Sequence, residues 1–145
     1  GLINNYQYSV AFWVKPETIT QFTPVFFGAA STSSWLSFLP ESWDGNTMLW
    51  SGQAWFDGSA GEQIPQGQWT HMAFSVDKGF VTVYLNGEEK YSGGSIADIF
   101  STSTSTFSLG VNYWDTAFNG HIDDFKVFNK ALEAVDIANL AIAAE

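Results

Sequence analysis

The chain has 145 residues, of which 46% are hydrophobic and 17% aromatic, so it is long and apolar enough to fold as one domain around its own core. Fifteen acidic residues against 5 lysines, without arginine, give a formal charge of −10, which argues against nucleic acid or an anionic membrane as a partner. The absence of cysteine excludes disulfides and thiolate metal sites, and no apolar run approaches the roughly 20 residues of a membrane-spanning helix.

The N-terminus is the first feature along the chain. It begins with Gly1-Leu2-Ile3 and carries neither an initiator Met nor a signal peptide. We therefore expect residues 1–145 to form a single domain that is part of a longer polypeptide, and we expect it to be monomeric.

Apolar and polar residues alternate with a period of two along most of the chain, which predicts β-strands. Pro16 should end the first strand because it has no N–H for the ladder. Asn86-Gly87 predicts a tight hairpin turn, and Asp44-Gly45-Asn46 and Asp57-Gly58 are interpreted as plain turns. The expected strands cover residues 8–15, 25–29, 35–39, 47–51, 54–56, 68–76, 80–85, 88–92, 107–111 and 121–128.

Many short strands separated by turns predict an all-β fold, a two-sheet antiparallel β-sandwich of the jelly-roll type. The tail from Leu132 to Ala144 predicts a short C-terminal helix. The shared parity of apolar residues within the strands predicts a core that includes Val10, Phe12, Met72, Phe74, Val81, Val83 and Leu85.

Three stretches in order resemble the concanavalin A-like, laminin-G-like jelly rolls. They are residues 8–16 (YSVAFWVKP), residues 68–77 with the following VYLNG at 83–87, and residues 119–132 (NGHIDDFKVFNKAL). The resemblance implies one concave and one convex antiparallel sheet. It also implies non-catalytic recognition, most often of carbohydrate and sometimes of protein, and a structural calcium ion near residues 120–124.

The sequence gives little support to the hypothesis that this domain is an enzyme. His71 lies in the middle of a strand and is interpreted as structural, and the sequence contains no nucleophile elbow and no phosphate loop. Asp123 and Asp124 are adjacent, so they point to opposite faces of a strand unless a bulge intervenes. We therefore expect no catalytic activity, although the parent protein is compatible with a glycoside hydrolase.

Asp123 and Asp124 have a second interpretation as calcium ligands. Calcium takes oxygen ligands from carboxylates and backbone carbonyls, and we expect carbonyls of the N-terminal segment to complete the set. The alternative is that one of the two aspartates caps a turn and the other is solvated.

The seven tryptophans are the most informative feature, because the flat C–H faces of sugars stack on indole rings. The segment 31–62 is unusually rich in them and departs from the family pattern. Trp13 and Trp69 are interpreted as packing residues, Trp35 stays open, and Trp43 has the alternative of folding back over the sheet edge. The candidate carbohydrate-binding residues are Trp43, Trp114, Tyr113, Trp50 and Trp55 for stacking, with Asn112, Asp115 and Asn119 for sugar hydroxyls.

These features favour a non-catalytic carbohydrate-binding module of a secreted or cell-surface protein. The lack of arginine weighs against acidic sugars, which are usually clamped by bidentate Arg, so we expect a neutral, glucose-based polysaccharide. The alternative is a protein-binding adhesion module of the same fold, which predicts a flat patch in place of a groove lined with Trp.

Overall fold

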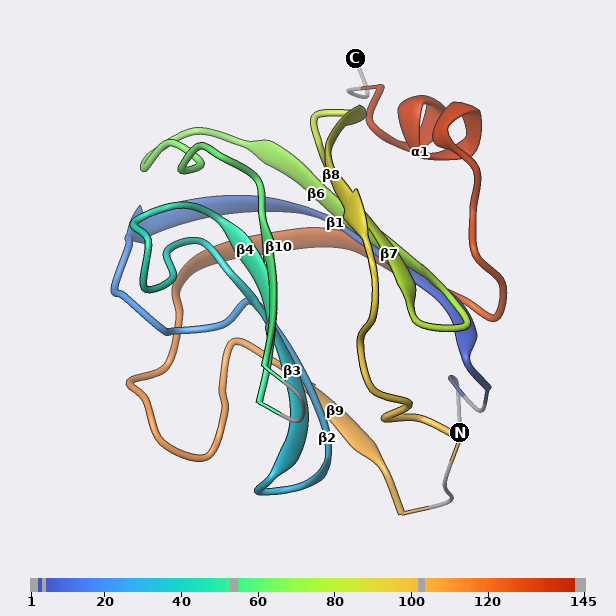
Figure 1. Ribbon diagram of the computed structural model, residues 1–145. Coiled ribbons are helices and arrows are strands. Elements are labelled where there is room, and N and C mark those ends of the chain that lie inside the picture. The colour runs from blue at the N-terminus through green and yellow to red at the C-terminus, as the bar shows by residue number, and fades with distance from the viewer. Residues whose placement is uncertain (1–2, 4, 53–54, 102–103, 143–145) are drawn as a thin grey trace.

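Two five-stranded antiparallel sheets pack face to face in the computed structural model, which describes residues 3, 5–52, 55–101 and 104–142 (Figure 1). Sheet I contains, in spatial order, β10 (Asn119–Phe128), β1 (Gln7–Thr18), β6 (Thr70–Asp77), β7 (Phe80–Leu85) and β8 (Glu88–Gly93). Sheet II contains β5 (Phe56–Ser59), β4 (Met48–Ser51), β3 (Ser34–Leu39), β2 (Phe26–Ser31) and β9 (Thr106–Leu109). The predicted all-β sandwich of the jelly-roll type is confirmed.

The core fills the space between the two sheets. Rings from opposite sheets meet there edge to face, as Phe12 does with Phe38 at 5.9 Å between ring centroids. Phe26 lies 5.8 Å from Phe74 in the same layer. The predicted core residues are all confirmed as buried: Val10, Phe12, Met72, Phe74, Val81, Val83 and Leu85.

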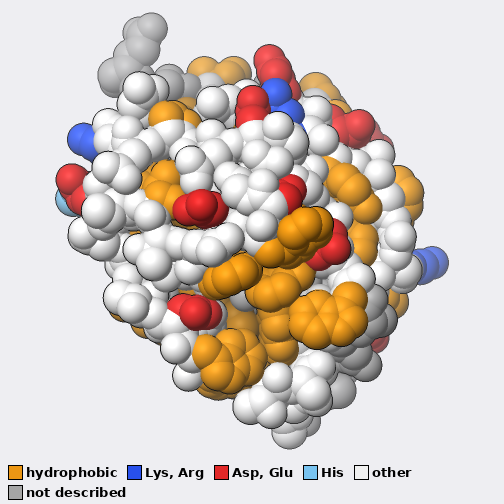
Figure 2. All heavy atoms as spheres, turned by 60° about the vertical axis from the view of Figure 1, so that its left-hand side comes forward, with side chains coloured by type: hydrophobic (Ala, Val, Ile, Leu, Met, Phe, Trp, Pro, Cys, Tyr) orange, Lys and Arg blue, Asp and Glu red, His pale blue; other side chains and the backbone are white. Residues whose placement is uncertain are grey.

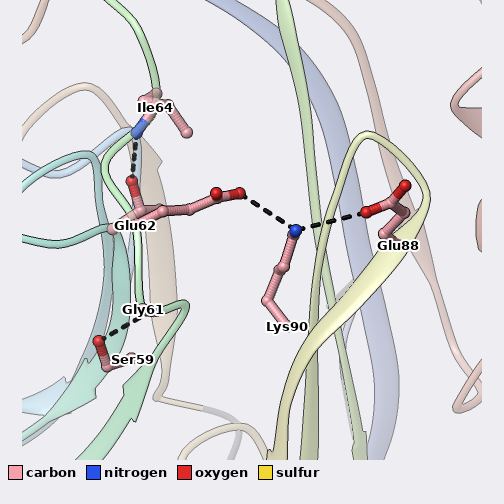
Figure 3. A network of polar contacts seen from close by, with 7 residues as sticks. Ser59, Gly61, Glu62, Ile64, Glu88 and Lys90 are labelled. Carbon is pink, nitrogen blue, oxygen red and sulfur yellow. Dashed lines mark hydrogen bonds and ion pairs between the residues drawn. The ribbon is translucent and has the colours of Figure 1, made fainter.

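One edge of the sandwich is closed by polar and aromatic contacts of β8 with β5 and with the segment that follows β5. Lys90 Nζ lies 3.3 Å from Glu62 Oε1 and 3.3 Å from Glu88 Oε2, so one ammonium bridges the two sheets (Figure 3). Tyr91 contacts Phe56 at the same edge, with ring centroids 5.7 Å apart.

A short helix, α1 (Ala134–Leu140), covers the outer face of sheet I (Figure 1). Its buried Ile137 packs with Leu132 and Tyr84, and a capping box between Glu133 and Asp136 stabilises its first turn. The helix ends earlier than predicted, and residues 143–145 lie outside the described residues. No helix in the described part of the chain is long and apolar enough to cross a membrane.

The predicted stop at Pro16 is wrong, because β1 continues to Thr18. The pairing of β1 with β6 ends at Val14, opposite Thr70, so the missing N–H of Pro16 takes no bond from that ladder. The carbonyl of Pro16 still accepts a hydrogen bond from the Gly67 N–H at 2.7 Å.

The predicted turn at Asp57-Gly58 is also wrong, because both residues lie within β5. Asp57 pairs with Trp50 and Gly58 pairs with Leu49 of β4. The expected strand over 54–56 is displaced accordingly, since β5 begins at Phe56, and Ala54 lies outside the described residues.

Candidate functional site

A row of side chains crosses the outer face of sheet II. Strand pairing places Asp57, Trp50, Ser37, Phe27 and Ser108 opposite one another on five successive strands. Successive side chains of a strand point to opposite faces, so this row faces away from the core. On β5, β4, β3 and β2, the residue that precedes or follows each member of this row points to the other face and is buried in the main core: Phe56, Leu49, Phe38 and Phe26.

A hollow of about 290 Å³ opens on this face. Trp50 forms one wall, with its ring centroid 5.1 Å from that of Trp35 and 5.5 Å from that of Phe22, which stacks on it. Trp35 in turn meets Trp114 at 5.7 Å. Figure 2 shows hydrophobic side chains gathered around a hollow on this side of the molecule, with acidic groups among them. The lining residues are Phe22, Trp35, Ser37, Trp50, Asn112, Trp114 and Asp115.

The loop between β9 and β10 supplies the polar rim. It is closed at its base by a hydrogen bond of 2.7 Å from the Phe118 N–H to the Gly110 carbonyl. Thr23 Oγ1 donates to the Thr116 carbonyl at 2.9 Å and so ties the loop to the segment that carries Phe22. The loop is therefore closed on itself at its base and tied to the segment before β2 near its C-terminal end.

Asn112 organises this loop from within. Its Oδ1 accepts hydrogen bonds from the backbone N–H groups of Trp114 and Asp115, at 2.9 and 2.8 Å. Its Nδ2 donates to Asp115 Oδ2 at 2.8 Å. These bonds hold the backbone at Trp114 and the Asp115 carboxylate in place at the rim of the hollow.

Two aromatic residues beside Trp50 have a left-handed backbone. Phe22 has φ of +69° and Trp55 has φ of +35°. Bulky residues rarely adopt this region, and each instance costs about 1–3 kcal/mol. Such strain tends to persist at functional sites, and here both strained residues hold a ring against Trp50, at 5.5 and 5.8 Å.

The structure gathers most of the predicted binding residues on this one face. Trp50, Trp114, Asn112 and Asp115 line the hollow. Tyr113 contacts Trp114 beside it at 5.4 Å. Two other candidates, Trp55 and Trp43, lie toward the β5 edge of sheet II. Asn119 does not line the hollow, and its Nδ2 donates a hydrogen bond to Thr18 Oγ1 of β1.

Sequence reasoning missed Phe22 and Ser37 and left Trp35 open. Trp35 and Ser37 share one parity on β3, and Ser37 is a small polar residue within a run of large apolar ones. A small polar side chain among large apolar ones on one strand face is therefore the feature of the sequence that could have indicated a hollow over β3. Phe22 has no comparable signal, because its place depends on the fold of the loop before β2.

The three side chains that the sequence predicts to have packing or structural roles, His71, Trp13 and Trp69, lie on the outer face of sheet I. His71 is 2% exposed, and its ring meets the half-buried Trp13 edge to face at 5.2 Å. Burial, with the nearby Lys126 ammonium, lowers the pKa of His71 to about 4. Trp69 is 46% exposed beside His121, so it packs less than expected.

A bulge on β10 changes the geometry of Asp123 and Asp124. The pairing with β1 shifts here and Asp124 has φ of +53°, so both aspartates are exposed while Ile122 and Phe125 pack on the core. Asp123 Oδ1 accepts from the Asp124 N–H at 2.8 Å.

The calcium site expected at these aspartates stays a prediction. Lys126 Nζ lies 3.3 Å from Asp124 Oδ2 and competes with a cation for that carboxylate. Two carboxylates supply only part of the about six to eight oxygens that calcium takes. Within the described ranges, no group of three or more His, Cys, Asp and Glu side chains is placed to hold a metal ion.

The model of the concanavalin A-like lectin/glucanases superfamily matches residues 1–138. The chain belongs to this superfamily. No curated protein sequence matches it.

Solved structures of this superfamily fold include one at high sequence identity. Domain 4 of AbnA, an extracellular GH43 arabinanase of Geobacillus stearothermophilus solved in complex with arabinotriose, is 50% identical, with a TM-score of 0.94 over 97% of this chain and 68% of that one. The fold is shared at 18% identity by a SAP-like pentraxin of Limulus polyphemus, with a TM-score of 0.70 over 94% of this chain and 70% of that one. The fold is also shared at 14% identity by a putative carbohydrate-binding protein of Bacteroides ovatus, with a TM-score of 0.69 over 97% of this chain and 42% of that one.

Proposed function

We propose that this domain is a non-catalytic carbohydrate-binding module that takes a neutral, arabinose-based oligosaccharide in the aromatic hollow of sheet II. The observation that carries the proposal is the hollow itself, where Trp35, Trp50 and Trp114 surround a space of about 290 Å³ with Asp115 at its rim. The 50% identity to an arabinanase domain solved with arabinotriose supports the class of sugar. The comparisons give no support to the glucose-based ligand expected from the sequence.

The hollow has the chemistry that a sugar requires. Aromatic rings offer flat apolar surfaces for the C–H faces of a sugar ring, and a carboxylate accepts hydrogen bonds from hydroxyls. Ligand pockets combine such apolar walls with a few fixed polar groups. A protein-binding module would present a flatter patch, so the hollow favours the carbohydrate.

The charge distribution supports a neutral ligand. All five lysines lie in the strands of sheet I or in the segments next to them, and the sequence has no arginine. Sheet II therefore offers no cation to a uronate or a sialic acid, and Asp115 would repel either. The five lysines are Lys15, Lys78, Lys90, Lys126 and Lys130.

The non-catalytic role is supported by the lining residues. Hydrolysis of a glycosidic bond commonly uses two carboxylic acids that flank the bond. Among the described residues that line the hollow, Asp115 is the one carboxylate. By likeness to the extracellular arabinanase, we propose that the module belongs to a secreted or cell-surface protein.

The test is calorimetric titration of the domain with arabinotriose, with maltotriose and cellotriose as glucose-based trimers and trigalacturonate as an acidic one. We expect saturable binding of arabinotriose, weaker or undetectable binding of the glucose trimers, and none of trigalacturonate. Incubated arabinotriose should remain intact by chromatography. Binding of a glucose trimer in preference to arabinotriose would overturn the sugar class, and release of arabinose would overturn the non-catalytic role.

A further inference from the structure

Three side chains lie beyond the hollow, at the β5 edge of sheet II. Trp43 is 57% exposed and Trp55 is 69% exposed, and Asp57 is exposed with them. Large exposed apolar groups gathered at one place on a monomer commonly mark an interaction site. None of the three is among the residues that line the hollow.

This edge continues directly from the hollow. Asp57 is the register partner of Trp50, on the strand next to it, so the two side chains are neighbours on the same face. The Trp55 ring lies 5.8 Å from the Trp50 ring, at an interplanar angle of 38°. Trp43 reaches the same place from the loop before β4, where its Nε1 donates a hydrogen bond of 3.2 Å to Asp57 Oδ1.

The loop that carries Trp43 is held in place by its own polar contacts. Asp44 accepts hydrogen bonds from the Asn46 backbone N–H at 2.9 Å and from Ser59 Oγ at 2.6 Å. Burial raises the pKa of the Asp44 carboxyl, but these bonds outweigh it and lower the pKa overall. The loop is further closed by the Ser42 N–H bonded to the Asn46 carbonyl at 2.9 Å.

The exposure of Trp43 is therefore a feature of an ordered loop. Its indole is fixed to Asp57 with more than half of its surface in solvent, which avoids part of the entropy cost of binding. A carboxylate offers about four acceptor positions on its two oxygens, so Asp57 can accept from Trp43 and from a ligand hydroxyl together.

We infer that Trp43, Asp57 and Trp55 form a second sugar subsite, which receives the continuation of the oligosaccharide held in the hollow. This inference rests on the proposed function. The occupant is the next unit of the same neutral chain, because stacking surface and a hydroxyl acceptor recur here and no lysine lies on this sheet. Affinity should then increase with the length of the oligosaccharide.

The experiment is calorimetric titration of the parent, Trp43→Ala and Trp50→Ala with arabinobiose, arabinotriose and arabinopentaose. We expect the parent to bind the pentaose at least about tenfold more tightly than the biose, a difference of ~1.4 kcal/mol. Trp43→Ala should lose most of this gain and bind the biose like the parent. Trp50→Ala should weaken binding at every length. Trp69→Ala, which removes an exposed Trp on the outer face of sheet I, is the matched control and should behave like the parent.

A second variant separates the ring from its hydrogen bond. Trp43→Phe keeps an aromatic face and removes the N–H that bonds to Asp57, so it should retain part of the length dependence. Equal affinity of the parent for all three lengths, or a Trp43→Ala profile identical to that of the parent, would overturn the second subsite while leaving the hollow as the binding site. Failure of the parent to bind any of the three would instead overturn the proposed function, and the subsite with it.

Discussion

The indole of Trp35 lies directly over Gly52. The Gly52 N–H donates to the Trp35 carbonyl at 3.3 Å, and a Cβ at Gly52 would lie 2.3 Å from Cε2 of the Trp35 ring. Trp35 is consequently 8% exposed, packed between Phe27 and Trp50. The floor of the hollow therefore depends on a glycine that does not itself line it.

Gly52→Ala should displace the Trp35 ring. The clash is with a rigid ring in a packed position, so we expect a loss of about 1–3 kcal/mol in the free energy of unfolding, as for other overpacked sites. Because the displaced ring lines the hollow, arabinotriose binding should weaken as well. Denaturant melts and calorimetric titration measure the two effects.

Gly61→Ala is the matched control for this change. Gly61 has φ of +74°, and a Cβ added there would meet nothing within 4 Å, so its replacement strains the backbone without touching the hollow. It should lower stability and leave arabinotriose binding unchanged. Parent-like binding by Gly52→Ala would contradict the dependence of the hollow on Gly52.

We expect His71 to lower the free energy of unfolding at acidic pH. Its folded pKa of about 4 lies below its ordinary value of 6.5, chiefly through burial, so the native state favours the neutral ring. The contribution is fully present above pH 6.5 and is lost progressively as the pH falls from about 6.5 to about 4, to a total of about 3 kcal/mol. Denaturant melts at pH 7 and pH 4.5 measure the loss.

The comparison variant is His71→Phe, which cannot titrate and should lose less stability between the two pH values than the parent. His121→Gln provides the control, because His121 is exposed and forms its ion pair with Glu17 at the surface. An identical pH dependence in the parent and His71→Phe would refute the role of His71.

The alternation of residues was sufficient to predict the core. Val10 and Phe12 on β1 face inward as expected, because burying one face of a strand fixes its register. The hairpin at Asn86-Gly87 also follows from sequence, since the two residues have φ of +52° and +81°, which a type I′ turn requires.

The hollow could not be predicted in the same way. It depends on the register of β3 with β4, which places Ser37 beside Trp50, and on loops that bring Phe22 and Trp114 to the same place. No local pattern in the sequence encodes that long-range alignment. Loop residues such as Trp114 were accessible to sequence reasoning because their composition alone is unusual for a turn.

Calcium binding at Asp123 and Asp124 remains a proposal with its own test. An ion that binds the native state alone stabilises it, by about 2.7 kcal/mol at a hundredfold excess over Kd. We expect a higher Tm in millimolar calcium than in EDTA, and no such difference in Asp123→Asn. Equal Tm values in the two buffers for the parent protein would count against this site.

Trp114→Ala is the variant that shows whether the aromatic hollow of sheet II binds the oligosaccharide. Trp114 lines the hollow with 55% of its surface exposed, so its removal should leave the Tm nearly unchanged. The measurement is titration with arabinotriose of the parent, Trp114→Ala and the control Trp69→Ala. We expect a loss of about 2 kcal/mol or more in binding free energy for Trp114→Ala alone. Parent-like affinity of a folded Trp114→Ala would contradict it.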